Sequence, residues 1–169
     1  MEDRNTPEGT DPEGSSRQRI LDAALRLFGR RGYEETSVAE LARAADVSKG
    51  LVYHYFDTKR DVLDAVMARG AGRLEAALAH DRSDRSPPAP AALVMEVLGL
   101  VAEDLAWWRL FFRLRMQPEL GRELGLDSRE RSLEEALERS LRAAGAADPR
   151  HEARALAAAV EGTARRYVL

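Results

Sequence analysis

A chain of 169 residues is long enough for one small domain followed by a larger helical one. It contains no Cys, which excludes disulfides, thiolate metal ligands and thiol chemistry. Leu, Ala, Arg and Glu are abundant, and the two-residue alternation of strands is hard to find. The composition therefore predicts an all-α protein.

The net charge of −3 is unevenly distributed. Residues 1–16 carry a net charge of −4, residues 17–70 carry +2 and residues 71–169 carry −1. Attraction to phosphate depends on the local face rather than on the whole chain. The middle segment is therefore the candidate for binding nucleic acid.

The composition of the first 16 residues predicts neither ordered structure nor a secretory signal. Residues 1–16 are rich in Glu, Asp, Pro, Gly and Ser, which is typical of a disordered tail. They lack the basic-then-apolar pattern of a secretory signal. No apolar run approaches the roughly 20 residues that span a membrane. We expect a soluble cytoplasmic protein without a membrane partner.

Residues 17–31 predict a first helix. Its apolar face has helical spacing, and Gly32 follows as a stop; the face consists of Ile20, Ala23, Ala24, Leu27 and Phe28. Two short helices follow within residues 36–61. Ser37, or Thr36 before it, suits the N-cap of the first, and Glu40 would complete a capping box with Ser37. Asp46 then suits a tight corner, because Asp tolerates left-handed backbone geometry.

Residues 48–56 predict the second short helix, with Ser48 as its N-cap. Val52, Tyr55 and Phe56 face inward, so the outward residues are Lys49, Gly50, Leu51, Tyr53 and His54. Two short helices joined by such a turn form a helix-turn-helix, whose second helix enters the DNA major groove. Lys49 can contact phosphate or guanine, and Tyr53 and His54 can donate to phosphate oxygens. Gly50 allows close approach of the backbone.

These residues resemble a known family. The matching pieces are residues 36–42, 47–50 and 52–56, then Thr58, Lys59 and Leu63. Their order and spacing are similar to the DNA-binding domain of TetR-type transcriptional regulators over about residues 17–66. The chain departs at Asp46, where the family usually has Gly, and at Val52, which replaces Leu. Asp46 places a negative charge beside the DNA-facing surface.

The resemblance implies three parts: a tail at 1–16, a helix-turn-helix DNA-binding domain at 17–66, and a helical regulatory and dimerisation domain at 67–169. It also implies that Lys59 contacts phosphate. The predicted DNA-binding residues are Thr36, Ser37, Ser48, Lys49, Gly50, Leu51, Tyr53, His54 and Lys59. The implied function is that of a ligand-responsive homodimeric repressor of a palindromic operator. The residues themselves do not separate a repressor from an activator.

Further helices are expected beyond the motif. A helix should begin at Asp57 or Thr58 and run to about His80, and residues 82–90 read as a proline-rich linker. Residues 91–106 are apolar on more than one face, which predicts a central helix of the second domain. An aromatic cluster follows at residues 107–116 and ends at Pro118.

Two final helices are predicted at residues 127–144 and 148–169, the last with Asp148 as N-cap and Pro149 at its first position. One recognition helix reads few base pairs, so two copies about 34–36 Å apart give useful specificity. The resemblance implies that these two helices form the dimer interface as a four-helix bundle. Similar proteins usually run longer, so either a minimal bundle or a further C-terminal helix is expected.

A ligand pocket for an apolar or aromatic effector is predicted in the second domain, and its candidate lining is Met95, Leu98, Trp107, Trp108, Phe111, Phe112 and Met116. The same spacing suits a plain core, and both interpretations stay open. Trp107 and Trp108 are adjacent, so at most one should enter a common cavity. An Arg from among Arg109, Arg113 and Arg115 inside it would indicate an anionic ligand.

Enzymatic and metal-binding functions find no support in the sequence. The three His residues are scattered, and there is no Ser-His-Asp grouping or phosphate-binding Gly loop. The adjacent acidic pair Glu103 and Asp104 reads as surface charge. We expect no enzyme, no cofactor and no metal site. The alternative to a DNA-binding regulator is a helical protein-interaction module, which would show no salt-dependent DNA binding.

Overall fold

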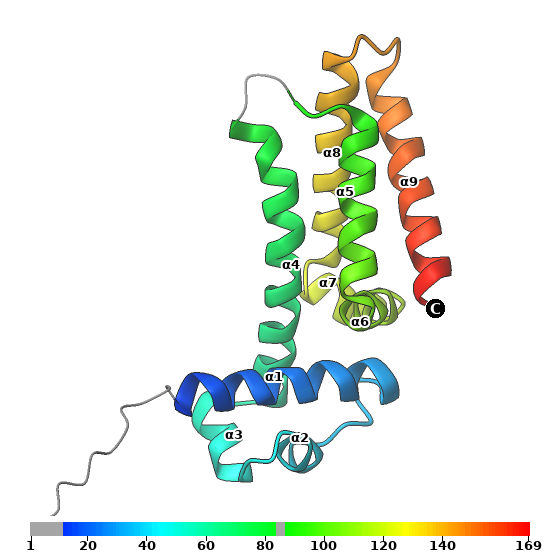
Figure 1. Ribbon diagram of the computed structural model, residues 1–169. Coiled ribbons are helices and arrows are strands. Elements are labelled where there is room, and N and C mark those ends of the chain that lie inside the picture. The colour runs from blue at the N-terminus through cyan, green and yellow to red at the C-terminus, as the bar shows by residue number, and fades with distance from the viewer. Residues whose placement is uncertain (1–11, 84–86) are drawn as a thin grey trace, which may run out of the picture. The chain divides into compact units, whose positions relative to one another are not determined.

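The computed structural model describes residues 12–83 and 87–169, and these fold into nine α-helices without a strand (Figure 1). This confirms the all-α prediction. The chain divides into two compact units, the first ending at Leu63 and the second beginning at Asp64. The boundary lies inside helix α4 (Lys59–Ser83).

The first unit contains α1 (Pro12–Arg31), α2 (Val38–Ala44), α3 (Lys49–Tyr55) and the start of α4. Helix α1 lies across α2 and α3 (Figure 1). The apolar faces predicted from helical spacing meet in the core of this unit, where Ile20, Phe28, Leu41, Val52 and Phe56 are all buried. Burial of these side chains fixes how the three helices pack.

Helix α1 begins earlier than the sequence suggested. Its first residue is Pro12, so the prediction of a disordered tail over residues 1–16 is wrong for residues 12–16, and residues 1–11 lie outside the described residues. Proline is favoured at the first helical position because its fixed φ suits a helix and its missing N–H costs nothing there. Ser16 is buried, and its hydroxyl accepts a hydrogen bond from Arg19 Nη2 at 3.2 Å.

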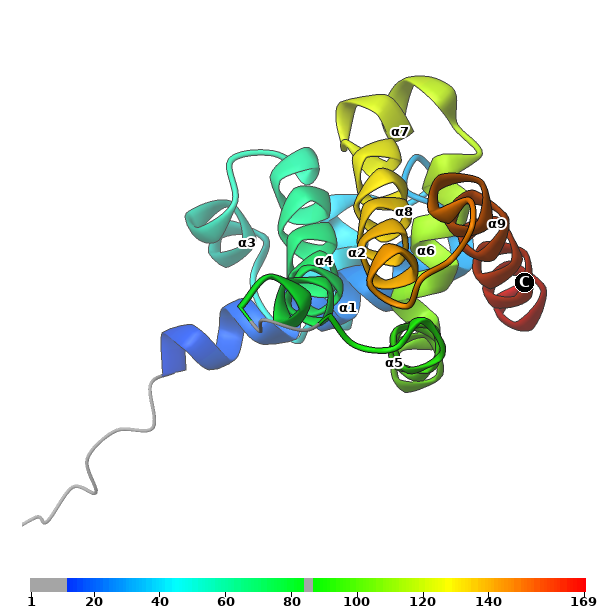
Figure 2. The same ribbon diagram turned by 90° about the horizontal axis from the view of Figure 1, so that it is seen from above.

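The second unit contains the rest of α4 and five further helices: α5 (Pro90–Glu103), α6 (Leu105–Arg115), α7 (Pro118–Glu123), α8 (Leu126–Ala143) and α9 (Pro149–Val168). Helices α8 and α9 pack against each other as antiparallel neighbours, with α5 beside both, and α6 runs across them (Figures 1 and 2). None of the helices in the described part of the chain is long and apolar enough to cross a membrane.

The predicted N-cap of α9 is confirmed, and a glycine follows the end of α8. Gly145 follows α8 with a φ of +81°, a left-handed conformation that glycine adopts without steric cost. Asp148 Oδ1 accepts a hydrogen bond from the His151 N–H at 3.1 Å, and Pro149 is the first residue of α9. Gly145 therefore marks the end of α8, and Asp148 with Pro149 marks the start of α9.

A helix break at Asp104 was missed. The apolar segment 91–106 was expected to be one helix, but α5 ends at Glu103 and α6 begins at Leu105. Asp104 Oδ1 accepts a hydrogen bond from the Trp107 N–H at 3.1 Å and so N-caps α6. Its other oxygen lies 3.6 Å from Arg73 Nη1. Asp104 is therefore a structural residue, and its interpretation as surface charge is corrected.

Two further expectations change. The linker predicted at residues 82–90 is shorter, because α4 continues to Ser83 and α5 begins at Pro90, while residues 84–86 lie outside the described residues. Helix α5 is not central in this chain. Its buried face carries Leu93, Val97 and Val101, whereas Met95 on the opposite face is 67% exposed.

Candidate functional site

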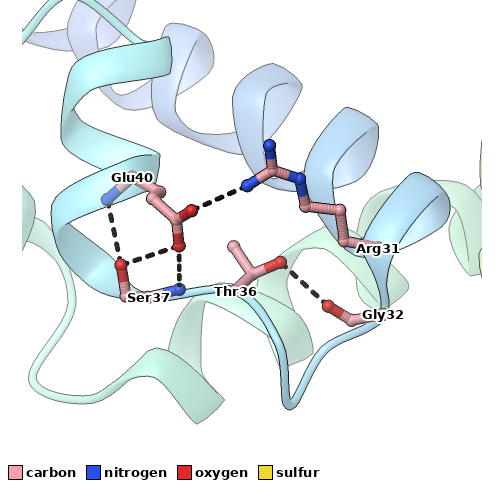
Figure 3. A network of polar contacts seen from close by, with 5 residues as sticks. All are labelled: Arg31, Gly32, Thr36, Ser37 and Glu40. Carbon is pink, nitrogen blue, oxygen red and sulfur yellow. Dashed lines mark hydrogen bonds and ion pairs between the residues drawn. The ribbon is translucent and has the colours of Figure 1, made fainter.

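The start of α2 is fixed by a polar network (Figure 3). The Glu40 backbone N–H donates to Ser37 Oγ at 3.2 Å, and the Ser37 N–H and hydroxyl both donate to Glu40 Oε2 at 2.9 Å. Arg31 Nη1 lies 2.7 Å from Glu40 Oε1, which ties α2 to the end of α1. These contacts, led by the Ser37 N–H, lower the pKa of Glu40 below its ordinary value of 4.5. The predicted capping box is confirmed.

The turn between α2 and α3 has the left-handed residue that the sequence suggested. Asp46 has a φ of +53°, and the Val47 N–H donates to the Ala42 carbonyl at 3.0 Å. Arg19 Nη1 on α1 donates to the Asp46 carbonyl at 3.2 Å. The turn is therefore held both by its own backbone and by a cation from another helix.

Helix α3 presents a short polar face to solvent. Ser48 N-caps the helix, its Oγ accepting from the Leu51 N–H at 3.0 Å. Lys49, Gly50 and His54 are exposed, and Tyr53 is 46% exposed. Lys49 Nζ lies 5.7 Å from the centre of the Tyr53 ring, one helical turn away. A lysine and a tyrosine held together on one exposed face suit contact with a phosphate backbone.

The start of α4 repeats the capping pattern. The Thr58 N–H and hydroxyl donate to Asp61 Oδ2 at 2.8 and 2.9 Å, and the Asp61 N–H donates to Thr58 Oγ1 at 3.1 Å. The predicted choice between Asp57 and Thr58 as cap is thereby decided in favour of Thr58. The residue after the cap, Lys59, is directed at the loop that follows α1.

The second unit contains an apolar cavity of about 50 Å³. Its walls come from α4, α5, α6, α8 and α9, and the aromatic side chains are Trp108, Phe111 and Phe112 of α6. The two polar lining residues are Arg115 and Glu161, whose Nη1 and Oε1 atoms lie 2.8 Å apart. This volume is well below the roughly 300–1,000 Å³ of sites for drug-sized ligands. The cavity therefore suits a small occupant or one that moves the walls apart.

No group of three or more His, Cys, Asp or Glu side chains in the described ranges is placed to hold a metal ion. At the two sites the side chains offer hydrogen bonding and ionic contact at α3 and apolar contact in the cavity.

Residues 20–66 match the model of the family described as "Bacterial regulatory proteins, tetR family". These residues therefore form a TetR-family DNA-binding domain.

Similarity to individual TetR-family regulators is concentrated in the first part of the chain. The transcriptional regulator AcrR of Shigella flexneri is 34% identical over 89 residues, which are 53% of this chain and 41% of AcrR. HbdR of Aromatoleum sp. is 45% identical over 56 residues, which are 32% of this chain and 24% of HbdR. The chain thus matches less than half the length of these curated relatives.

Solved structures extend the likeness to both units. A TetR-like regulator from Rhodococcus sp. RHA1 superposes with a TM-score of 0.73 at 28% identity, covering 90% of this chain and 84% of that one. GusR of Salmonella enterica superposes with a TM-score of 0.68 at 26% identity, covering 95% of this chain and 85% of that one. The TetR-family architecture, an N-terminal helix-turn-helix domain followed by a helical domain, therefore covers most of this chain.

The predicted DNA-binding residues occupy different environments within this TetR-family domain. Ser48, Lys49, Gly50, Tyr53 and His54 come together along the exposed side of α3, and Leu51 beside them is half-buried. Their contact with DNA stays a prediction.

Three other members of the predicted set are engaged elsewhere. Thr36 is 1% exposed, and its hydroxyl donates to the Gly32 carbonyl at 2.8 Å, so the side chain is not at the surface and its predicted DNA contact is corrected (Figure 3). The Ser37 hydroxyl is used in the capping box. Lys59 Nζ donates to the Tyr33 and Glu34 carbonyls at 2.9 and 3.3 Å and lies 4.3 Å from the Tyr33 ring centre. A phosphate contact by Lys59 would have to share this ammonium group.

The predicted ligand residues also separate into two groups. Trp108, Phe111 and Phe112 line the cavity, and the rest of the predicted set does not. Met95 and Met116 are 67% and 71% exposed in this chain, so their assignment to the lining is corrected. Leu98 is half-buried outside the cavity lining.

Trp107 does not line the cavity, although its ring meets the Trp108 ring edge to face with the ring centres 5.0 Å apart. Its Nε1 donates to the Val66 carbonyl at 3.2 Å, and its ring lies against Gly70 on α4. A Cβ built on Gly70 would be 2.2 Å from the Trp107 ring, so only glycine fits there. Trp107 therefore joins α6 to α4 instead of lining the cavity.

Sequence reasoning missed the walls contributed by distant helices. Val97 and Val101 of α5, Leu133 of α8, and Val160 and Glu161 of α9 all line the cavity. Their helical spacing marked most of them as buried, but nothing in the sequence indicated that they face one shared space. Only the packing of the five helices α4, α5, α6, α8 and α9 brings the lining residues together.

Proposed function

We propose that this chain is a DNA-binding transcriptional regulator that acts as a homodimer on a palindromic operator and releases it in response to a small effector. The supporting observation is the exposed face of α3, where Lys49, Gly50, Tyr53 and His54 follow a capped helix start and a left-handed turn. Such a helix can enter the major groove while its polar side chains contact phosphates and base edges.

A dimer follows from the same geometry. A seven-residue helix reads few base pairs, so two copies about one turn of DNA apart are needed for useful specificity. We place the interface on α8 and α9, the last two helices, in keeping with the TetR-family resemblance. A regulator of this kind works where the chromosome lies, which in a bacterium is the cytoplasm. Effector binding in the second unit would alter the spacing of the two α3 helices and release the operator. The regulator would therefore repress transcription when no effector is bound.

The test is selection from a pool of random duplex DNA followed by sequencing, for wild type, Tyr53→Ala and Met95→Ala. We expect a palindromic sequence to be enriched by wild type and by Met95→Ala, a control altered at an exposed side chain of α5. Enrichment should be lost with Tyr53→Ala. A sizing column on the same samples establishes the oligomeric state.

Failure of wild type to enrich any sequence at low salt, with a dimer on the column, would contradict the proposal. The alternative function, a helical protein-interaction module, predicts that outcome and also predicts that Lys49→Ala is silent. If DNA is bound, Lys49→Ala should weaken binding to all sequences and reduce the slope of log affinity against log salt by about 1.

A further inference from the structure

We propose that the cavity of the second unit selects small uncharged effectors, and that the Arg115–Glu161 ion pair is what sets this preference. The inference rests on the proposed function, which supplies the expectation of an effector. It adds the chemical class of the ligand and the residues that discriminate it.

The cavity wall offers almost no polar contact. Apart from Arg115 and Glu161, every lining residue is aliphatic or aromatic. Trp108, Phe111 and Phe112 form the aromatic side, with the Trp108 and Phe111 ring centres 5.4 Å apart. An apolar body that displaces solvent here is favoured by burial, because the aliphatic and aromatic side chains of the wall have little to lose in hydrogen bonds to water.

The one ionic feature of the wall carries both signs. Arg115 Nη1 and Glu161 Oε1 lie 2.8 Å apart, and the two side chains are 24% and 26% exposed. An anion could approach Arg115 only beside the Glu161 carboxylate, and a cation could approach Glu161 only beside the Arg115 guanidinium. Either ligand meets a like charge and must break a partly buried pair. A neutral ligand leaves the pair intact.

This pairing changes what Arg115 implies. An arginine in the cavity wall would by itself indicate an anionic ligand, as the sequence suggested. Glu161 comes from α9, 46 positions further along the chain, and its carboxylate already contacts Nη1 of the guanidinium. The local positive charge is thereby offset, and the wall is close to neutral.

The test uses three ligands with the same phenyl body and different heads: 2-phenylethanol, phenylacetate and 2-phenylethylamine. Each is titrated at neutral pH into wild type, Glu161→Gln, Arg115→Gln and the control Glu138→Gln, with binding followed by calorimetry. Glu138 pairs with Arg142 on the surface of α8 outside this cavity, so the control breaks an ion pair elsewhere. Circular dichroism confirms that each variant is folded.

We expect wild type and Glu138→Gln to bind 2-phenylethanol at least about tenfold more tightly than either charged ligand. In Glu161→Gln the Arg115 guanidinium loses its carboxylate, so the affinity for phenylacetate should rise about tenfold relative to 2-phenylethanol. In Arg115→Gln the same gain should appear for 2-phenylethylamine. If one variant fails to fold, the other still tests whether the ion pair sets the preference for an uncharged ligand.

Equal or tighter binding of a charged ligand by wild type would overturn the proposal. An unchanged ratio between the affinities for the charged ligand and for 2-phenylethanol in a folded Glu161→Gln or Arg115→Gln variant would also overturn it. Absence of binding by all three ligands would also overturn it. Binding of the selected operator is measured in the same samples. Intact operator binding with failed ligand binding refutes only the effector class, whereas lost operator binding by wild type refutes the proposed function.

Discussion

The two units differ in how far apart in the sequence the residues lie whose contacts stabilise each unit. In the first unit the caps at Ser37 and Thr58 bond to residues three positions along the chain. In the second unit Trp107 bonds to a carbonyl 41 positions away, Arg109 to one 59 positions away and Ser140 to one 52 positions away. Local contacts close short loops at small entropic cost, whereas distant contacts form only when the whole unit packs.

This difference explains where sequence reasoning works. Capping residues announce themselves by type and spacing, and the helix starts at Ser37, Ser48 and Thr58 were found that way. The first unit also has two contacts of longer range, Arg19 to Asp46 and Lys59 to Tyr33, at 27 and 26 positions. Lys59 had been predicted to contact phosphate, and the structure directs both cations at backbone carbonyls.

The largest expected effect is the loss of a distant contact. Trp107 is 2% exposed, so Trp107→Ala removes a buried ring and should lower the free energy of unfolding by about 3–5 kcal/mol. Chemical denaturation followed by circular dichroism measures this change. The control Met116→Ala truncates an exposed side chain and should change stability by less than about 0.5 kcal/mol. A small effect of Trp107→Ala would mean that α6 does not depend on α4.

The same contact can be broken from α4. Gly70→Ala places a methyl group 2.2 Å from a buried ring and should destabilise by about 1–3 kcal/mol. Gly72→Ala has nothing within 4 Å and should instead stabilise the helix by up to about 1 kcal/mol. In a Trp107→Ala background the cost of Gly70→Ala should largely disappear, as a double-mutant cycle would reveal. Additive effects would show that the ring is not what excludes a side chain.

Removal of a helix N-cap should lower the free energy of unfolding by less than the loss of the Trp107 contact. Ser37→Ala removes the acceptor for the Glu40 N–H and should destabilise by about 1 kcal/mol. Ser37→Asn keeps a side-chain acceptor at the cap and should recover most of that stability. Denaturant melts of the three proteins make the comparison. If Ser37→Ala cost as much as Trp107→Ala, the contrast between the two units would fail.

The smallest effect concerns pH. Contacts to Ser37 and Arg31 lower the pKa of Glu40, so its carboxylate stabilises the fold above the unfolded pKa of about 4.5 and this stabilisation is lost as pH falls through the lower folded value. Glu40→Gln should therefore be less stable than wild type at pH 7 and approach it below the folded pKa. Denaturant melts across pH 2–7 measure this convergence. A difference that stayed constant with pH would assign the effect to something other than the charge.

The sequence by itself determined the helical class, the helix-turn-helix and the N-terminal starts of α2, α3, α4 and α9 to within a residue, because these depend on residue type within three or four positions. It also indicated that at most one of Trp107 and Trp108 enters the cavity, and Trp108 is the one that lines it. The break at Asp104 was within reach, as Asp is a favoured N-cap, but the continuous apolar pattern obscured it.

Only the tertiary structure decided which side chains share a space. It placed Val160 and Glu161 of α9 around the same cavity as Phe112 of α6 and left Met95 and Met116 outside that cavity. It also buried Thr36, whose hydroxyl donates to the Gly32 carbonyl. Helical spacing shows that a residue lies on an apolar face, yet it does not show which helix covers that face. That choice follows from the packing of distant segments, whose free energy no local pattern contains.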